Sequence, residues 1–382
     1  MNPRILISDI FLRKSFDAYN IIKARFPEHE RIITVDKKLS GGKRLLKWLL
    51  FNDRCCKLSS KNYKQFESDL LAIQKQFAGE KIVYIPVEEK TTEFFLEYAH
   101  NHSTDMFLFV LPEADGFNTA KNKKELNFFC HQAGIPCPQP YKWSEIDTTS
   151  KDKLIFKPVE GSGSRGIYFK SPSELTSEDF AKKEKYHIQE LLPNPKDVHG
   201  CFYLVKEGTV VSAYGHKRLR TFPETGGVTV LSRFNHNERA LAVGTKLLEK
   251  LNWNGLAMVE FLYDDKDDQY KVIEINPRLW GSILLSEYAN ANLLTNYVLM
   301  SLKKELRNEH INPDTKIRWV FPYDFIYLLQ RKISLKEFLY NADNVCFINW
   351  TYAHKMKALL FQLSLVFNAE NISKYLKSRQ KK

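Results

Sequence analysis

The sequence predicts an α/β domain with a parallel sheet at the N-terminal end, followed by a mixed α+β region rich in hairpins. Apolar runs typical of buried strands, at 5–8, 31–35 and 81–87, alternate with helical periodicity at 16–26 and 91–102. Strands that alternate with helices are typical of a parallel sheet. After Pro112 the strand-like runs are instead joined by glycine-rich or acidic turns, which predicts antiparallel hairpins.

The length and composition fit a soluble protein of two or three domains. The 382 residues exceed one ordinary domain, and they are 43% hydrophobic and 27% charged. No run of 18 apolar residues predicts a transmembrane helix, and Asp9 interrupts the first apolar run too early for a signal peptide. Six cysteines without C-x-x-C spacing indicate a reducing compartment, so we expect the cytoplasm.

The net charge of +12 is concentrated toward the C-terminal end. From Lys303 onward there are fifteen Lys and Arg residues against seven Asp and Glu. Such an excess favours an anionic partner, nucleic acid or a membrane surface, and a tail that only improves solubility is an equal alternative.

Residues 118–140 predict a helix followed by an extended segment. Apolar residues recur at helical spacing from 126 to 133, and Gly134 with three following prolines ends the helix. Lysines crowd its first turn, where the macrodipole disfavours cations. A nearby phosphate would explain them, and a solvated first turn is the alternative. The three are Lys121, Lys123 and Lys124.

The stretch KPVEGSGSRG, Lys157 to Gly166, contains a formal G-x-G-x-x-G. A dinucleotide fingerprint needs a helix after the loop, and a Walker A loop ends in G-K-[ST]. Here the strand-like KLIF precedes the loop and IYFK follows it, so neither motif applies. Protein kinases cover ATP with a similar hairpin, but their lysine lies on the strand after the loop. The lysine of this hairpin precedes its loop.

A second hairpin, GLAMVEFLYDDKDDQYKVIEINPRLWGS, carries two glutamates that we expect to face each other. With the acidic turn centred on Asp267, Glu260 pairs directly with Glu274, and Asn276 shares their face. A turn with an even number of residues would separate the glutamates. Facing like charges are destabilising, and a shared divalent cation such as Mg²⁺ is the natural remedy. Two solvated glutamates on an exposed edge are the alternative.

Together the two hairpins resemble the ATP-grasp superfamily, which includes biotin carboxylase, carbamoyl phosphate synthetase and D-alanine–D-alanine ligase. KLIFKPVEGSGSRGIYF is similar to its phosphate-covering hairpin, and VEF, an acidic hairpin and EINPR are similar to its metal signature, in the same order. The resemblance runs from about Phe117 to Thr295. It implies a pre-ATP-grasp, Rossmann-like α/β domain (1–115), small (116–186) and large (187–307) ATP-grasp subdomains that clamp ATP, and a basic, mostly helical C-terminal segment (308–382).

The resemblance also implies roles for individual residues. Arg278 corresponds to the arginine that holds the acyl phosphate or its carboxylate. Arg218 and Arg220 are candidates for binding substrate anions, with an exposed basic strand as the alternative. The implied magnesium ligands, for one or two ions that Mn²⁺ could replace, are Glu260, Glu274 and Asn276. The implied phosphate contacts are Lys123, Lys157, Gly161, Ser162, Gly163, Ser164 and Gly166. HIQELLPNPKD resembles the adenine hinge of the family, which implies adenine contacts at Glu190 and Leu192 and a ribose contact at Asp197.

The activity implied by the resemblance is an ATP-dependent carboxylate–amine ligase. ATP would convert a small-molecule carboxylate into an acyl phosphate, which an amine attacks to form an amide. Activation of bicarbonate, as in carbamoyl phosphate synthetase or a carboxylase, is one alternative. A non-catalytic polyanion or membrane-surface binder is another, and no specific nucleic-acid partner is expected. The sequence identifies neither the substrates nor the oligomeric state.

The C-terminal segment after about Asn308 falls outside the resemblance. RWVFPYDFIYLLQRKISLKEFLY and KMKALLFQLSLVF are apolar stretches framed by basic residues. The second is too short and too interrupted to span a bilayer. It predicts either ordinary packing against the ligase domain or an interfacial helix at the inner membrane surface.

Overall fold

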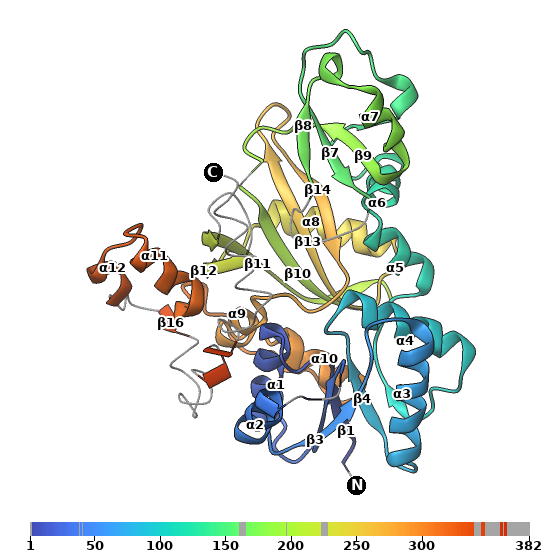
Figure 1. Ribbon diagram of the computed structural model, residues 1–382, viewed down its shortest axis with the longest axis vertical. Helices are drawn as coiled ribbons and strands as arrows, with labels where there is room; N and C mark the ends of the chain where they lie inside the picture. Colours follow the sequence, from blue (N-terminus) through green and yellow to red (C-terminus); the bar gives the residue numbers. More distant parts are fainter. Residues whose placement is uncertain are drawn as a thin grey trace.

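The computed structural model describes residues 2–37, 39, 41–159, 166–195, 197–222, 228–339, 345–347, 360–361 and 363–364. Three sheets organise these residues, with helices packed around them (Figure 1). No helix of the described residues is long and apolar enough to cross a membrane. Cys55, Cys56, Cys130, Cys137 and Cys201 are free thiols.

The N-terminal part has the predicted parallel sheet, with strand order β3-β2-β1-β4-β5. Both faces are buried because alternate residues of each strand enter different hydrophobic clusters, as with Ile5 and Leu6. Helix α1 covers one face, and α3 and α4 cover the other. The elements are β1 (Arg4–Ile7), α1 (Arg13–Arg25), β2 (Arg31–Val35), α2 (Gly41–Leu50), β3 (Arg54–Lys57), α3 (Tyr63–Gln76), β4 (Ile82–Ile85), α4 (Glu89–Asn101) and β5 (Phe107–Leu108).

The segment predicted as one helix forms two, α5 (Ala114–Lys121) and α6 (Lys123–Gln132). Asn122 separates them because its side chain accepts hydrogen bonds from the backbone N–H groups of Lys124 and Glu125, which is an N-cap. Gly134 ends α6 with a φ of 63°, as its sequence position predicted. The cap fixes Lys123 as the first residue of α6.

A small antiparallel sheet of order β6-β9-β7-β8 carries the predicted glycine hairpin. Strands β7 and β8 pair directly, so the strand–loop–strand arrangement is confirmed. Strand β9 pairs with β7, which extends this sheet through Glu190, four residues beyond the limit expected for the small subdomain. The elements are β6 (Pro140–Tyr141), β7 (Leu154–Pro158), β8 (Tyr168–Lys170), α7 (Ser177–Ala181) and β9 (Tyr186–Glu190).

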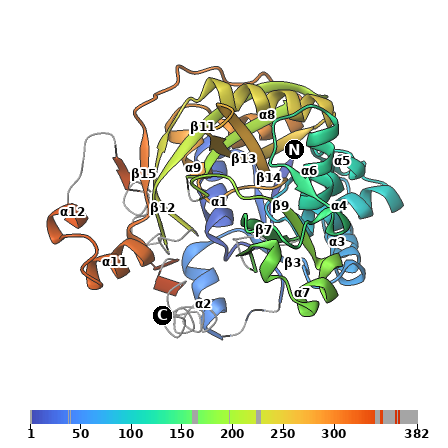
Figure 2. The same ribbon diagram turned by 90° about the horizontal axis from the view of Figure 1, so that it is seen from above.

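The largest sheet has the order β14-β13-β10-β11-β12-β15-β16. One face packs against α6 and α8, and the other packs against α9, α10 and the N-terminal α1 (Figures 1 and 2). Its elements are β10 (His199–Lys206), β11 (Thr209–Phe222), β12 (Val228–Phe234), α8 (Glu238–Lys250), β13 (Gly255–Asp264), β14 (Gln269–Asn276), α9 (Ile283–Tyr288), α10 (Leu293–Ser301), β15 (Lys316–Arg318) and β16 (Val345–Phe347).

The C-terminal segment combines strand and helix. Strands β15 and β16 extend the large sheet, while a π-helical turn (Val320–Asp324), α11 (Phe325–Leu329) and α12 (Leu335–Leu339) project to one side of the molecule (Figure 2). Farther along, Phe361 is fully buried and stacks on Phe16 of α1, with ring centroids 4.1 Å apart. That residue of the second apolar stretch therefore packs into the core.

Candidate active site

The predicted pairing of Glu260 with Glu274 is confirmed in the β13–β14 hairpin, and Asn276 lies opposite Met258 in the same register. Glu260 therefore follows Met258 on one face of β13, where the hydrophobic core gives way to charge. The two carboxylates and the amide line one face of the large sheet.

The reason for this pairing differs from the predicted one. Asp264 pairs with Gln269, so the turn has four residues, an even number that by itself would separate the glutamates. The register shifts between Glu260 and Phe261, because Val272 and Glu274 are the partners of these neighbours and Ile273 is an extra residue. This bulge returns Glu274 to the face of Glu260.

Each of the two glutamates has a cationic neighbour. Lys123 Nζ lies 3.7 Å from Glu274 Oε1, and Arg218 forms an ion pair with Glu260. Burial raises the pKa of Glu274, and the facing Glu260 raises it further, while Lys123 and Arg278 oppose this. The pair is thus held at high local charge density away from bulk water.

The donor set fits a hard divalent cation. Across the described ranges no three His, Cys, Asp or Glu side chains gather as a metal cluster. Glu260, Glu274 and Asn276 instead offer two carboxylates and one amide oxygen, and oxygen donors of this kind suit Mg²⁺ when phosphate and water complete its coordination. The raised pKa of Glu274 is consistent with a site that a cation would stabilise.

Lys157 lies on β7 and is 7% exposed. Burial lowers its pKa to about 8, and Glu274 partly opposes this effect while Lys123 adds to it. Lys123, Lys157, Glu260 and Glu274 therefore share one electrostatic environment, although their positions span more than 150 residues of sequence. His187 of β9 pairs directly with Lys157 of β7. Burial and, to a smaller extent, the positive charge of Lys157 lower the pKa of His187 to about 3.

The backbone joins the two lysines as well. Lys123 N–H donates to the carbonyl of Val159, 3.0 Å away, immediately after β7. The start of α6 is thereby attached to the strand that leads into the glycine loop. Of that loop, Gly161, Ser162, Gly163 and Ser164 lie outside the described residues, while Gly166 has a φ of 78°, a conformation that favours glycine.

The two candidate arginines of β11 lie in different surroundings. Arg218 pairs with Ser232 and Arg220 pairs with Leu231, so a bulge at Leu219 turns the two side chains to opposite faces. Arg218 reaches Glu260, whereas Arg220 forms an ion pair with Asp324 at 2.6 Å and another with Glu337. The structure therefore does not bring Arg220 to the carboxylates.

Arg278 joins the carboxylate face to the N-terminal domain. It donates to Asn276 Oδ1 at 2.8 Å and to the carbonyl of Leu279 at 3.0 Å. The same carbonyl accepts from Lys14 Nζ at 3.2 Å, and Leu279 N–H donates to Pro86 O at 3.0 Å. The segment after β14 therefore lies against the carboxyl-end edge of the N-terminal sheet.

This edge holds charged residues that the sequence did not indicate. In sheet order, β1 and β4 flank the point where the chain reverses direction, and open α/β sheets bind ligands there. Asp9 follows β1, Glu88 follows β4, and Lys14 lies 2.8 Å from Glu88. Burial and, to a smaller extent, the nearby charge of Glu88 raise the pKa of Asp9 to about 6. Asp9 Oδ2 is buried without a hydrogen-bond partner. Burial and, to a smaller extent, the positive charge of Arg278 lower the pKa of Lys14 to about 8.

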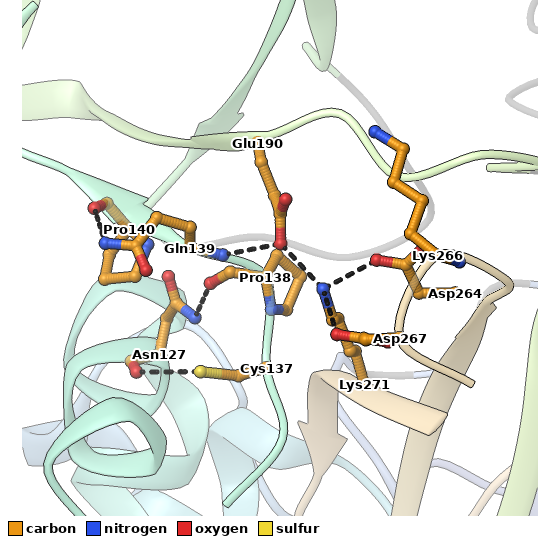
Figure 3. Close-up of polar contacts among 10 residues, drawn as sticks. All are labelled: Asn127, Cys137, Pro138, Gln139, Pro140, Glu190, Asp264, Lys266, Asp267 and Lys271. Atoms are coloured by element: carbon orange, nitrogen blue, oxygen red, sulfur yellow. Dashed lines mark hydrogen bonds and ion pairs between the residues drawn. The ribbon is translucent and has the colours of Figure 1, made fainter. Parts of the chain in front are cut away.

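The predicted adenine hinge is tied into a polar network (Figure 3). Glu190 Oε1 accepts from the Gln139 N–H at 2.9 Å and from Lys271 Nζ at 3.0 Å. Lys271 also contacts Asp264 and Asp267, and although burial opposes the charge, hydrogen bonds to Asp264 and Glu190 raise its pKa. The Glu190 side chain is therefore held at the junction of the two sheets.

Two further hinge candidates lie apart from this network. Leu192 is 4% exposed, so its side chain serves packing. Asp197 is half exposed and lies 3.5 Å from His199 and 3.6 Å from Lys217. No hydrogen bond joins it to Glu190 among the described contacts.

His216 is a second feature that the sequence did not reveal as a site residue. Gly200 pairs with His216 on one side and with Glu260 on the other, so the imidazole belongs to the row of the two glutamates. A Cβ on Gly200 would lie 2.8 Å from His216 Nε2, so this glycine makes room for the ring. Burial lowers the pKa of His216, and the ring stays neutral beside Arg218.

Comparison with known proteins agrees with this geometry. Residues 120–282 match the family model of the ATP-grasp domain, so this region of the chain is an ATP-grasp domain, as the motifs predicted. No curated protein sequence matches the chain.

Solved structures share the fold over most of the chain. The biotin carboxylase domain of 2-oxoglutarate carboxylase from Hydrogenobacter thermophilus is 12% identical, with a TM-score of 0.62 over 82% of this chain and 73% of that one. The L-amino acid ligase from Bacillus licheniformis is 15% identical, with a TM-score of 0.58 over 82% and 78%. N5-carboxyaminoimidazole ribonucleotide synthetase from Thermotoga maritima is 13% identical, with a TM-score of 0.53 over 81% and 78%.

Proposed function

We propose that the protein is an ATP-dependent carboxylate–amine ligase. The observation that carries this proposal is the pairing of Glu260 with Glu274 beside two buried or half-buried lysines, within an ATP-grasp domain. The fold is shared with an L-amino acid ligase, and with a carboxylase domain whose structure contains MgADP and bicarbonate. The substrates would be a small-molecule carboxylate and an amine.

In the proposed mechanism the γ-phosphoryl group of ATP passes to an oxygen of the substrate carboxylate and ADP is released. The amine then attacks the carbonyl carbon, the phosphate leaves, and the amine nitrogen loses a proton. Lys123 and Lys157 would neutralise phosphate oxygens, and Arg278 would steady the acyl phosphate. Mg²⁺, held by Glu260, Glu274 and Asn276, would supply charge neutralisation.

The position of Arg278 supports a substrate site at the N-terminal domain. Arg278 and Lys14 approach the same Leu279 carbonyl, and Lys14 contacts Glu88. An acyl phosphate at Arg278 would therefore lie next to the edge that holds Asp9 and Glu88. Acidic groups there suit the ammonium or hydroxyl groups of a substrate.

A thermal-shift titration with ATP, with and without Mg²⁺, tests this proposal without knowledge of the substrates. Ligand binding to the folded state raises the free energy of unfolding by mass action, by about 2.7 kcal/mol at a ligand concentration a hundred times the dissociation constant, and the melting midpoint rises with it. We expect a magnesium-dependent rise in the wild type that Lys157→Ala loses. Lys153→Ala, which removes an exposed lysine just before the same strand, is the matched control and should behave as the wild type.

Two alternative functions predict outcomes that differ from those of the ligase proposal. Bicarbonate activation, favoured by the carboxylase structures of the same fold, predicts phosphate release that bicarbonate alone stimulates. A non-catalytic polyanion binder predicts no response to ATP and steeply salt-dependent stabilisation by polyanions. A wild-type protein that gives no magnesium-dependent rise would contradict the ligase proposal.

A further inference from the structure

Helix α2, with the sequence GGKRLLKWLL, has more apolar surface than its contact with the protein uses. Leu50 is buried and Leu46 packs against the same cluster, and these two residues attach the helix to the N-terminal domain. Leu45, Trp48 and Leu49 are 58%, 70% and 37% exposed. Their spacing of i, i+3 and i+4 places them on one outward face.

Three basic residues and no acidic residue accompany this face. They are Lys43, Arg44 and Lys47, so the ten residues of α2 carry three positive charges. The outward apolar side chains and the charges therefore occupy one short helix on the outside of the N-terminal sheet (Figures 1 and 2).

Trp48 is more exposed than the other described tryptophans. Trp253, Trp280 and Trp319 are at most 2% exposed, and Trp143 is partly buried. An exposed tryptophan between two exposed leucines is unusual on a water-facing surface, since large apolar groups are normally exposed singly. Tryptophan is instead enriched where a protein meets the headgroup region of a membrane.

We propose that α2 binds the surface of an anionic lipid bilayer through its outward apolar face, Leu45, Trp48 and Leu49, with Lys43, Arg44 and Lys47 on the remainder of the same helix. A helix with a compact apolar face and lysine and arginine on its polar remainder is typical of proteins that lie in the membrane interface. The apolar side chains enter the headgroup boundary, and the cations neutralise lipid phosphates.

The charges also argue against a second copy of the chain as the occupant. A two-fold contact through α2 would bring six positive charges together without a negative one on either helix. Phe361 packs in the cluster that holds Leu50, on the inner side of α2, and Leu45, Trp48 and Leu49 are not part of that cluster. The proposal is independent of the catalytic one.

Flotation of the full chain with vesicles tests the proposal. One set contains equal parts of phosphatidylglycerol and phosphatidylcholine, and the other contains phosphatidylcholine alone. We expect binding to the anionic set, with a blue shift of tryptophan fluorescence that Trp48→Phe removes. The triple variant Lys43→Gln, Arg44→Gln, Lys47→Gln should weaken binding by roughly fivefold for each charge, because each basic residue near such a surface contributes about 1 kcal/mol.

Replacement of exposed apolar residues on α2, with a matched replacement elsewhere as control, distinguishes binding by the face of α2 from nonspecific hydrophobic adsorption to vesicles. Leu45→Ser with Trp48→Ser should lose vesicle binding. Leu329→Ser with Leu335→Ser, which removes two leucines that are 67% and 60% exposed on α11 and α12, should retain it. Equal binding by both pairs would overturn the proposal.

A charge control addresses the basic C-terminal end. One control is the triple variant Lys182→Gln, Lys183→Gln, Lys185→Gln, which lowers the net charge by the same amount at an exposed site elsewhere and should leave binding unchanged. A second triple variant, Lys374→Gln, Lys377→Gln, Arg379→Gln, lowers the net charge by the same amount near the end of the chain. If that variant loses vesicle binding while the α2 variants retain it, the membrane contact lies in the C-terminal segment and the proposal is refuted. Self-association without lipid that Trp48→Ser abolishes would refute it as well.

Discussion

Glu274 faces Glu260 across the β13–β14 hairpin because Ile273 bulges out of the ladder. The four-residue turn sets one register for the residues near it, and the bulge sets another for the residues beyond it. A single unpaired residue thus decides which face of the sheet receives Glu274 and Asn276.

Insertion of one alanine after Ile273 should therefore abolish magnesium-dependent ATP binding. With the bulge still one residue long, the added residue takes the place opposite Glu260 and moves Glu274 to the other face of the sheet. The thermal shift with Mg²⁺ and ATP measures the loss. Deletion of Ile273 is the matched control, since the turn register then continues and Glu274 follows Val272 into the position opposite Glu260, so the response should be retained. A response that survives the insertion would argue against the metal assignment.

Glu274→Gln should leave the protein folded and remove turnover. In the free protein the change relieves a like-charge contact that costs up to about 1 kcal/mol, so the melting temperature should stay the same or rise. The amide has no charge to hold the cation, so ATP-dependent phosphate release should disappear once substrates are found. Glu249→Gln, an exposed glutamate on α8, should be neutral. Near-normal turnover of Glu274→Gln would exclude Glu274 as a ligand.

The affinity for Mg-ATP should fall above about pH 8. Burial lowers the pKa of Lys157 to about 8, so its ammonium loses its proton as the pH rises through that value, and the free protein must regain the proton to bind phosphate. The dissociation constant should rise by up to about tenfold per pH unit above pH 8. Lys157→Met should bind more weakly with a flatter profile. A dissociation constant of the wild type that does not change between pH 7 and 9.5 would contradict this role.

The same pKa has a consequence for stability. Between pH 8 and the ordinary lysine value of 10.5, Lys157 is neutral in the folded chain and charged in the unfolded one. The unfolded state then binds more protons, so the contribution of Lys157 to the free energy of unfolding rises with pH across this window and is lost as the pH falls through 8. Comparison of wild type and Lys157→Met by denaturation at several pH values isolates the effect.

Asp324→Asn should destabilise the attachment of the C-terminal segment. Asp324 is fully buried between Arg220 and Arg318, and removal of its charge leaves two arginines without their shared partner. Breaking a buried pair of this kind costs about 3 to 5 kcal/mol. Glu337→Gln, which removes the half-exposed second partner of Arg220, should cost less than about 1 kcal/mol. Equal melting temperatures for the two variants would show that the buried cluster contributes little.

Patterns in the amino-acid sequence were sufficient to identify the domain type and the two members of the carboxylate pair. Hydrophobic periodicity defined β1, β2, β4, α1 and α4, since local side-chain patterns depend only on the period of each element. It also showed that a strand precedes and follows the glycine loop, and that Glu260 and Glu274 can share a hairpin.

Strand register and contacts between distant segments could be established only from the folded chain. The bulges at Ile273 and Leu219 have no signal in the hydrophobic pattern, yet one brings Glu274 to the site and the other directs Arg220 to Asp324. Lys14 meets Leu279 across 265 positions of sequence, and such a pairing arises only when two domains pack. The low pKa of Lys157 likewise comes from burial, which depends on the whole fold.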